Sequence, residues 1–265
     1  MLTSGYKFLL NIDMLIRGVF CKITLQTSPV KVITQALYRA LTRRYKMSKR
    51  HVAVILSGCG VFDGAEIHES VLSLLALEHQ GADYQCFAPD IPQHHVINHL
   101  TGDEMDESRS VLVESARIAR GNIKALSEFN ASDFDALMLP GGFGAAKNLS
   151  SLAFDGPNCS VNTDVKNAVN AMLEARKPIG ALCITPAVIA KILEGKSAKL
   201  TIGSDPDTIG AIQAMGGDHK ETTHAEVVVD EKLKLVTSPC YMLDASISQI
   251  AEGAENTVSA MLALI

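Results

Sequence analysis

Cys183 is the residue of this 265-residue chain whose position best suits nucleophilic chemistry. It lies between a short apolar run, residues 178–182, and a proline, Pro186, that suits the first turn of a helix. A helix N-terminus favours the thiolate, which is the nucleophilic form of cysteine, so we expect Cys183 to be the most reactive thiol. A buried structural cysteine would occupy the same kind of sequence, because free cysteine is commonly buried. Position alone leaves both interpretations open.

Two further loops carry residue types that suit an active site. A glycine-rich loop covers residues 140–144, and glycine lets the backbone approach a ligand closely. The other loop follows the apolar run 51–57 and contains several groups that could do chemistry, namely Cys59, Asp63, Glu66, His68 and Glu69. In an open parallel sheet, loops of this kind converge at the carboxyl ends of the strands, where ligands bind.

The elements that must position these loops alternate between strand and helix. Short apolar runs predict strands at 51–57, 84–88, 135–140, 178–182 and 198–203. Helical spacing predicts helices that begin near residues 67, 107, 164, 186 and 244. This alternation requires crossover connections, so we expect a flavodoxin-like, doubly wound α/β fold with a mainly parallel sheet and helices on both faces. Residues 225–230 and 233–238 predict an added antiparallel hairpin.

Three motifs in this order resemble those of a known family. They are Gly64-Ala-Glu-Ile-His-Glu69, Pro140-Gly-Gly-Phe-Gly144 and Gly180-Ala-Leu-Cys-Ile-Thr-Pro186. Together they resemble the DJ-1/PfpI superfamily of class I glutamine amidotransferase-like proteins. Within it, the chain is most similar to the ElbB-type glyoxalase-like proteins and the vertebrate mitochondrial ES-one proteins. The resemblance runs from about residue 49 to the C-terminus.

The resemblance implies roles for individual residues. It makes Cys183 the nucleophile and Glu69 its partner carboxylate, which can move a proton if burial raises its pKa. It assigns the oxyanion hole to the backbone N–H groups of Gly142 and Ile184. Three further residues are expected to line the site: His68, Cys59 and Thr185.

The sequence departs from the family pattern at two positions. Many members carry a histidine shortly after the nucleophile helix, where this chain has Gly203, and Thr185 replaces a smaller residue. His224 and Glu226 form a His-x-Glu pair, but they precede a strand of the expected hairpin and suit a glutaminase triad poorly. The three histidines His94, His95 and His99 lack the spacing of a metal site, so no metal site is predicted.

Two functions follow from the resemblance. The first is a glyoxalase-like or deglycase-like enzyme that acts on small carbonyl substrates, such as dicarbonyls or their early adducts, with no cofactor. The second is a catalytically weak protein that senses redox state or binds a partner. The sequence leaves the choice between them open, as it does the existence of a homo-oligomer.

Residues 1–47 differ in charge from the rest of the chain. They hold eight basic residues and one acid, which leaves a net charge of about −12 for the remainder, given −5 for the whole chain. This composition predicts a removable mitochondrial transit peptide over 1–47, ahead of one domain over 48–265. A membrane anchor near residues 8–16 is disfavoured by interrupting polar residues, and Met47 could also start a cytosolic form.

The composition also excludes some partners. A pI near 5.9 disfavours nonspecific nucleic-acid binding, which requires a basic surface. No long apolar run predicts membrane insertion. The six cysteines show no paired spacing, so neither a disulfide framework nor a metal centre is expected.

Overall fold

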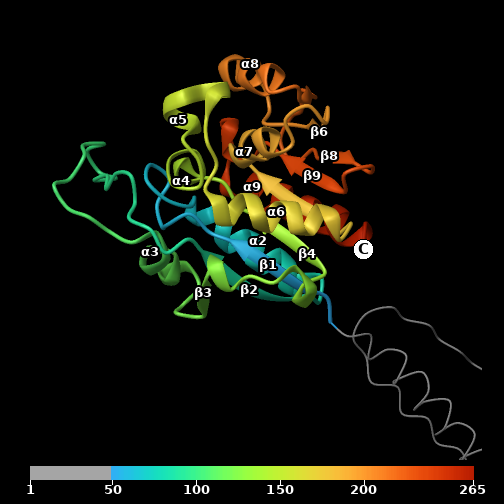
Figure 1. The fold of residues 1–265 in the computed structure, drawn as a ribbon, viewed down its shortest axis with the longest axis horizontal. Coiled ribbons are helices and arrows are strands. Elements are labelled where there is room, and N and C mark those ends of the chain that lie inside the picture. Colours follow the sequence, from blue (N-terminus) through green and yellow to red (C-terminus); the bar gives the residue numbers. More distant parts are fainter. Residues whose placement is uncertain (1–48) are drawn as a thin grey trace, which may run out of the picture. The chain divides into compact units, whose positions relative to one another are not determined.

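The computed structural model describes residues 49–265, which form one compact unit (Figure 1). The predicted transit peptide, residues 1–47, lies outside the described residues. The unit is built on a seven-stranded sheet with the order β3-β2-β1-β4-β5-β9-β8. Along this order the strands are β3 (Ile123–Ala125), β2 (Asp83–Ala88), β1 (His51–Ile55), β4 (Ala136–Leu139), β5 (Ile179–Leu182), β9 (Leu235–Ser238) and β8 (Val228–Asp230).

The central strands are buried on both faces, which explains why they are continuous apolar runs. Alternate residues of each strand enter two different hydrophobic clusters: Ile55 and Leu139 pack into one, Val54 and Met138 into the other. All neighbouring strands are parallel except β8 and β9. The predicted flavodoxin-like, mainly parallel sheet with an antiparallel pair is therefore confirmed.

Helices cover both faces of the sheet. Helices α2 (Ile67–His79) and α9 (Ile247–Ala263) pack against each other over one cluster. The other cluster receives α6 (Thr163–Glu174), which crosses in front of the sheet in Figure 1, and α7 (Thr185–Ile192). The remaining helices are α3 (Val111–Ile118), α4 (Phe143–Lys147), α5 (Leu152–Asp155) and α8 (Pro206–Ala214).

The predicted hairpin is not simply added at the edge of the sheet. Its second strand, β9, pairs antiparallel with β8 but also parallel with β5, so it lies inside the sheet beside the strand that precedes Cys183. The predicted strand at 198–203 is only β6 (Lys199–Leu200), which pairs with β7 (Asp218–His219) in a separate two-stranded sheet.

None of the helices within residues 49–265 is both long enough and apolar enough to span a lipid bilayer. The five cysteines of this part of the chain are all free.

Candidate active site

Cys183 lies in a sharp turn between β5, which ends at Leu182, and α7, which begins at Thr185. Its φ of 60° is left-handed, a conformation that costs a non-glycine residue about 1–2 kcal/mol. The Cys183 N–H donates to the Ser238 carbonyl at 2.9 Å, so the turn is held by the neighbouring strand β9. The residue is 7% exposed, and its thiol sits at the carboxyl end of the sheet.

Glu69 is held in the first turn of α2 without exposure to solvent. Its two carboxylate oxygens accept hydrogen bonds from the backbone N–H groups of Gly141, at 2.9 Å, and Tyr241, at 3.1 Å. Glu66 caps the helix by accepting the Glu69 N–H at 2.7 Å. Burial raises the pKa of Glu69 to about 7, because the N–H donors only partly offset the loss of hydration and the Glu66 charge adds to the rise.

The Cys183 thiol lies directly against this carboxyl group. The position that a Cβ on Gly141 would occupy is 2.9 Å from Cys183 Sγ and 2.5 Å from Glu69 Oε2. The two side chains share a hydrogen bond, so they titrate as a pair. A proton can therefore pass between them without moving the backbone.

The surroundings of the thiol oppose the stabilisation of the thiolate that is expected from the helix N-terminus. Burial raises the pKa of the thiol well above its usual value, and the charge of Glu69 raises it further. The Gly142 N–H acts in the opposite direction but does not compensate. The resting form is therefore a thiol, and its activation requires that Glu69 take up the proton.

The glycine loop lies over the thiol because its two glycines lack side chains. A Cβ on Gly141 would overlap the site, and a Cβ on Gly142, whose φ is 101°, would strike the backbone of Glu66. The Gly142 N–H is directed at Cys183, and Ile184 caps the N-terminus of α7. Within residues 49–265, no carbonyl pairs with either N–H group. No carbonyl would therefore have to be displaced from either donor by a negatively charged oxygen formed beside Cys183.

Thr185 is fully buried, and its hydroxyl donates to the Pro140 carbonyl at 2.8 Å. This bond connects the turn that carries Cys183 to the glycine loop. His68 is exposed and lies one residue before Glu69, with its Nδ1 2.9 Å from the hydroxyl oxygen of Tyr241. This contact links His68 to Tyr241, the residue whose N–H donates to Glu69.

Cys59 is not brought to Cys183. It is half-buried and lines a separate hollow with Arg117 and several apolar side chains of α2. Its pKa is raised by burial and then by the charge of Glu114.

The histidines do not supply a base beside Cys183. His224 bonds the Asp244 carbonyl at 2.8 Å and lines another hollow, away from the thiol. Gly203, at the place of the family histidine, has a φ of 91°, and a Cβ there would press on Leu243 at 2.9 Å. Among the described residues, no three His, Cys, Asp or Glu side chains converge as metal ligands.

Sequence reasoning missed Gly141, Tyr241 and Cys240. Gly141 could have been found, because a pair of adjacent glycines suggests that both positions need to lack a Cβ. The Tyr241 N–H reaches Glu69 from 172 residues away, and no local pattern signals it. Cys240 lies in the same apolar cluster as Cys183, and burial raises its pKa well above the usual value.

Comparison with known proteins identifies the family to which the chain belongs. Residues 60–245 match the model of the DJ-1/PfpI family, and the chain belongs to this family. It is 45% identical to the human glutamine amidotransferase-like class 1 domain-containing protein 3, mitochondrial, over 80% of this chain and 82% of the human protein. It is 43% identical to the rat ES1 protein homolog, mitochondrial, over 82% of this chain and 84% of the rat protein.

A solved structure shows the same fold. The chain is similar to an isoprenoid biosynthesis protein with an amidotransferase-like domain from Ehrlichia chaffeensis, with 38% identity and a TM-score of 0.76. The match covers 81% of this chain and 99% of the bacterial one. Three relatives, at 34–45% identity, are named as mitochondrial proteins, and the chain is a mitochondrial protein, as predicted.

Proposed function

We propose that this protein is an enzyme that converts small dicarbonyls, or their early adducts with amines and thiols, into hydroxy acids. The observation that carries the proposal is the buried pair of Cys183 and Glu69, in which the carboxyl has a pKa of about 7. A group with a pKa near the working pH is an efficient proton carrier. The backbone N–H of Gly142 is directed at Cys183 and that of Ile184 follows Cys183 in the turn; neither donates to a backbone carbonyl of the described residues.

The proposed reaction begins when Cys183 Sγ bonds to the aldehyde carbon as Glu69 takes the thiol proton. The aldehyde oxygen becomes an alkoxide, which the Gly142 and Ile184 N–H groups stabilise. The alkoxide then takes the proton from Glu69, which leaves a neutral hemithioacetal and a carboxylate. Glu69 removes the proton from the sulfur-bearing carbon, which gives an enediolate, and returns one to the neighbouring carbon, while the hydroxyl proton of the hemithioacetal moves to the neighbouring oxygen. This leaves a thioester of a 2-hydroxy acid. Water cleaves the thioester and restores the Cys183 thiol.

The balance of this reaction is one dicarbonyl and one water consumed for each hydroxy acid released. Its steps use protein groups and water alone. Glu69 serves as acceptor and donor in turn, so no second base is required. This fits a site in which a histidine is missing beside the thiol and the family's histidine position is Gly203.

A second candidate function is a redox sensor or partner-binding protein. Such a protein would have the same turn around Cys183 but no useful turnover. The 7% exposure of Cys183 favours it, because a large substrate cannot reach the thiol. The raised pKa of Cys183 argues against the redox form of this candidate, since peroxide oxidises the thiolate.

The test is to incubate the purified protein with methylglyoxal or glyoxal and to follow lactate or glycolate by proton NMR. Cys183→Ala should remove product formation. Cys159→Ala is the matched control, because Cys159 is also buried but lies in the other hydrophobic cluster. If wild type forms no hydroxy acid, or if Cys183→Ala forms as much as wild type, the enzymatic proposal fails.

We also propose that residues 1–47 are a transit peptide removed on import. The charge contrast with the remaining chain supports this. Mass spectrometry of the N-terminus of the protein from mitochondria should find a start near Ser48. A mitochondrial protein that begins at Met1 would contradict the proposal.

A further inference from the structure

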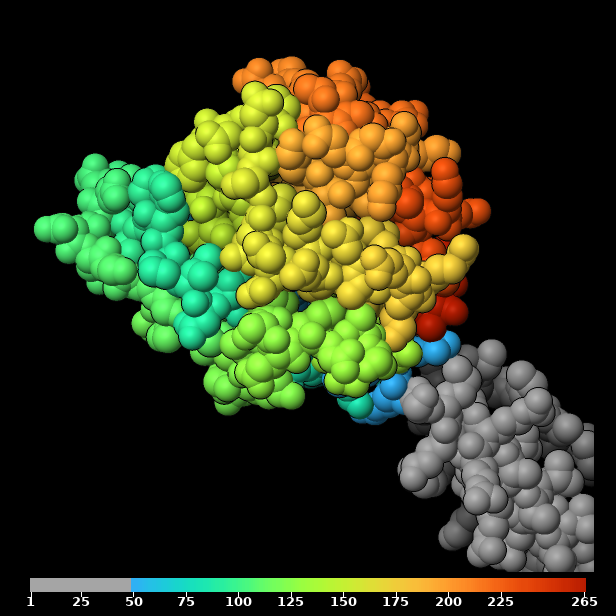
Figure 2. Space-filling model, in the orientation of Figure 1, coloured from blue at the N-terminus to red at the C-terminus, as the bar shows by residue number. Residues whose placement is uncertain are grey.

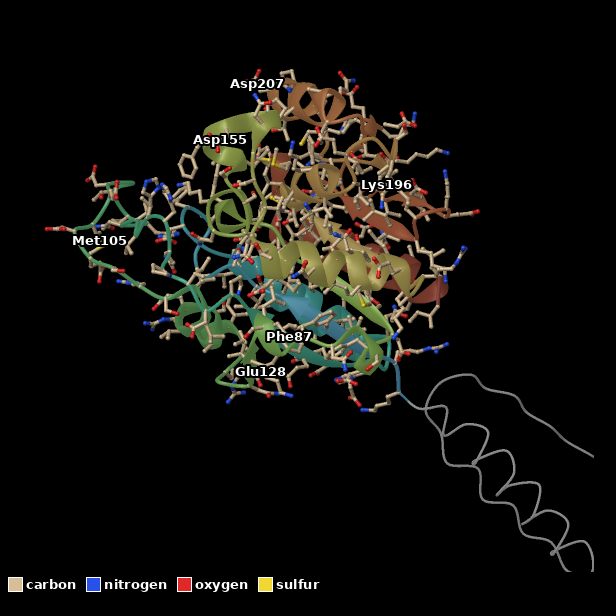
Figure 3. All side chains as sticks on the ribbon, in the orientation of Figure 1. Phe87, Met105, Glu128, Asp155, Lys196 and Asp207 are labelled. Atoms are coloured by element: carbon tan, nitrogen blue, oxygen red, sulfur yellow. The ribbon has the colours of Figure 1, made fainter. Side chains whose placement is uncertain are left out.

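A basic hollow lies at the end of the sheet opposite to Cys183. It is bounded by the end of α6, the loop after α7 and the β8–β9 turn, and its volume is about 240 Å³. Figure 2 shows this face, where the yellow, orange and red parts of the surface meet, and Figure 3 labels Lys196 beside it. Four cationic side chains line the hollow together with a single carboxylate, Glu174: Arg176, Lys196, Lys232 and Lys234.

This concentration of positive charge stands out in an acidic domain. The chain after residue 47 carries a net charge of about −12, yet the lining of the hollow has a net charge of about +3. In the part of the chain that the structure describes, none of the four cations takes part in an ion pair. Like charges gathered without counterions repel one another, so an anion that enters the hollow gains from all of them.

The loops that carry the cations are held in place by buried bonds. Asp230, which is 6% exposed, accepts the Leu233 N–H at 3.0 Å and the Lys199 N–H at 2.9 Å, so one carboxylate joins the β8–β9 turn to the loop before β6. The Lys234 carbonyl accepts the Ile179 N–H at 2.9 Å, and its ammonium group donates to the Leu264 carbonyl at 2.7 Å. The cations are therefore presented by an ordered frame.

Two of the cations occupy backbone positions that favour glycine. Arg176 has a φ of 54° and Lys234 a φ of 52°. Other helices of this chain end on glycine at the same place, such as Gly81 after α2 and Gly216 after α8. Arg120 has the same left-handed conformation after α3 and lies outside the hollow, so this conformation fixes where the two cations stand but does not by itself mark a binding site.

We propose that this hollow binds the polyphosphate group of a small soluble molecule. A diphosphate group carries enough negative charge to engage several cations, and Arg176 can bind phosphate oxygens in a bidentate manner. The concave shape suits a compact anion. The net negative charge of the domain opposes a long nucleic acid or an anionic membrane, both of which need an extended basic surface.

The hollow is distinct from the site of the proposed reaction. Ile179 begins β5 at the basic end, and Cys183 follows the other end of the strand, about 13 Å away at the usual rise per residue. Binding in the hollow should therefore survive Cys183→Ala, whether or not the protein is an enzyme.

The test is calorimetric titration of the full chain with sodium pyrophosphate, in metal-free buffer at low and at physiological salt. The double variant Lys196→Gln/Lys232→Gln should bind at least about tenfold more weakly than wild type, and wild-type affinity should fall as salt rises. The matched control is Lys124→Gln/Lys166→Gln, which removes the same charge from two exposed lysines outside the hollow. The basic segment 1–47 is present in every sample, so its contribution cancels.

Without ligand, neither double variant should unfold at a lower temperature than wild type, which excludes misfolding as the cause of weaker binding. Cosedimentation with cardiolipin vesicles is the second arm. The proposal is overturned if wild type does not bind pyrophosphate at millimolar concentration, or if the control loses as much affinity as the test variant. It is also overturned if only the vesicles bind through Lys196 and Lys232.

Discussion

Cys183 and Cys59 both follow a strand of the parallel sheet, and both lie near a buried glutamate, yet their surroundings differ in one respect. Glu114, beside Cys59, forms ion pairs with Arg117 at 2.8 Å and Arg109 at 3.7 Å. Glu69, beside Cys183, is held by uncharged donors, the backbone N–H groups of Gly141 and Tyr241 and the Cys183 thiol. A carboxylate without a cation can take up a proton near neutral pH when it is buried. Whether the neighbouring glutamate is paired with a cation thus decides which thiol can be activated.

The largest expected effect comes from removing the proton carrier. Glu69→Gln should lower dicarbonyl turnover by roughly a hundredfold or more, because the amide cannot accept the thiol proton. Glu114→Gln should leave turnover within about a factor of two per folded molecule. Hydroxy acid formation by both variants, measured by NMR, checks the comparison. Equal losses in the two variants would show that the pair at Cys183 has no special role.

The stability of the protein should depend on pH through Glu69. Its pKa is about 7 when folded and 4.5 when free, so the protonated form stabilises the fold. This stabilisation is full below about pH 4.5 and is lost as pH rises through 7. Between pH 5 and 8 the wild type should lose roughly 2–3 kcal/mol of unfolding free energy that Glu69→Gln does not lose. Urea unfolding of both proteins at the two pH values gives the difference, and parallel pH curves would refute it.

Alkylation should rank the two cysteines in the order opposite to that expected from sequence. Cys59 is half-buried, whereas Cys183 is 7% exposed and has a pKa well above its usual value. At pH 8, iodoacetamide should label Cys59 roughly tenfold faster, since only the thiolate reacts. Glu69→Gln should speed the labelling of Cys183 severalfold by removing a negative charge. Peptide-resolved mass spectrometry measures both rates, and a faster Cys183 in wild type would mean that its thiolate is stabilised after all.

The smallest effect concerns the hydrogen bond between His68 and Tyr241. Tyr241→Phe removes this bond and loosens the segment whose N–H donates to Glu69. That N–H lowers the pKa of Glu69, so a weaker bond should move the midpoint of the pH–turnover profile upward by a few tenths of a unit. Tyr84→Phe, on β2 beside the Cys59 hollow, is the control and should leave the midpoint unchanged. An unchanged or lowered midpoint in Tyr241→Phe would separate the tyrosine from the proton carrier.

Sequence patterns predicted most of the sheet and three of the loops at its carboxyl end. Apolar runs such as 51–57 and 178–182 predict buried parallel strands because they must pack on both faces. The helix boundaries were predicted less accurately. The helix expected to begin near residue 107 is Val111–Ile118, and α8 was not predicted. Residues around α8 are weakly patterned, because Ile212 is its only fully buried side chain.

The sequence alone determined the motifs and the order in which they occur along the chain: a glutamate early in a helix, two glycines after a strand, and a cysteine at an elbow. These signals are local, so neighbouring residues suffice to interpret them. Only the tertiary structure decided that Cys59 faces a different hollow, that β9 lies beside β5, and that the Tyr241 N–H reaches Glu69. It also decided the direction in which the pKa values of Cys183 and Glu69 shift, because the loss of hydration depends on everything packed around a group and not on its neighbours in the sequence.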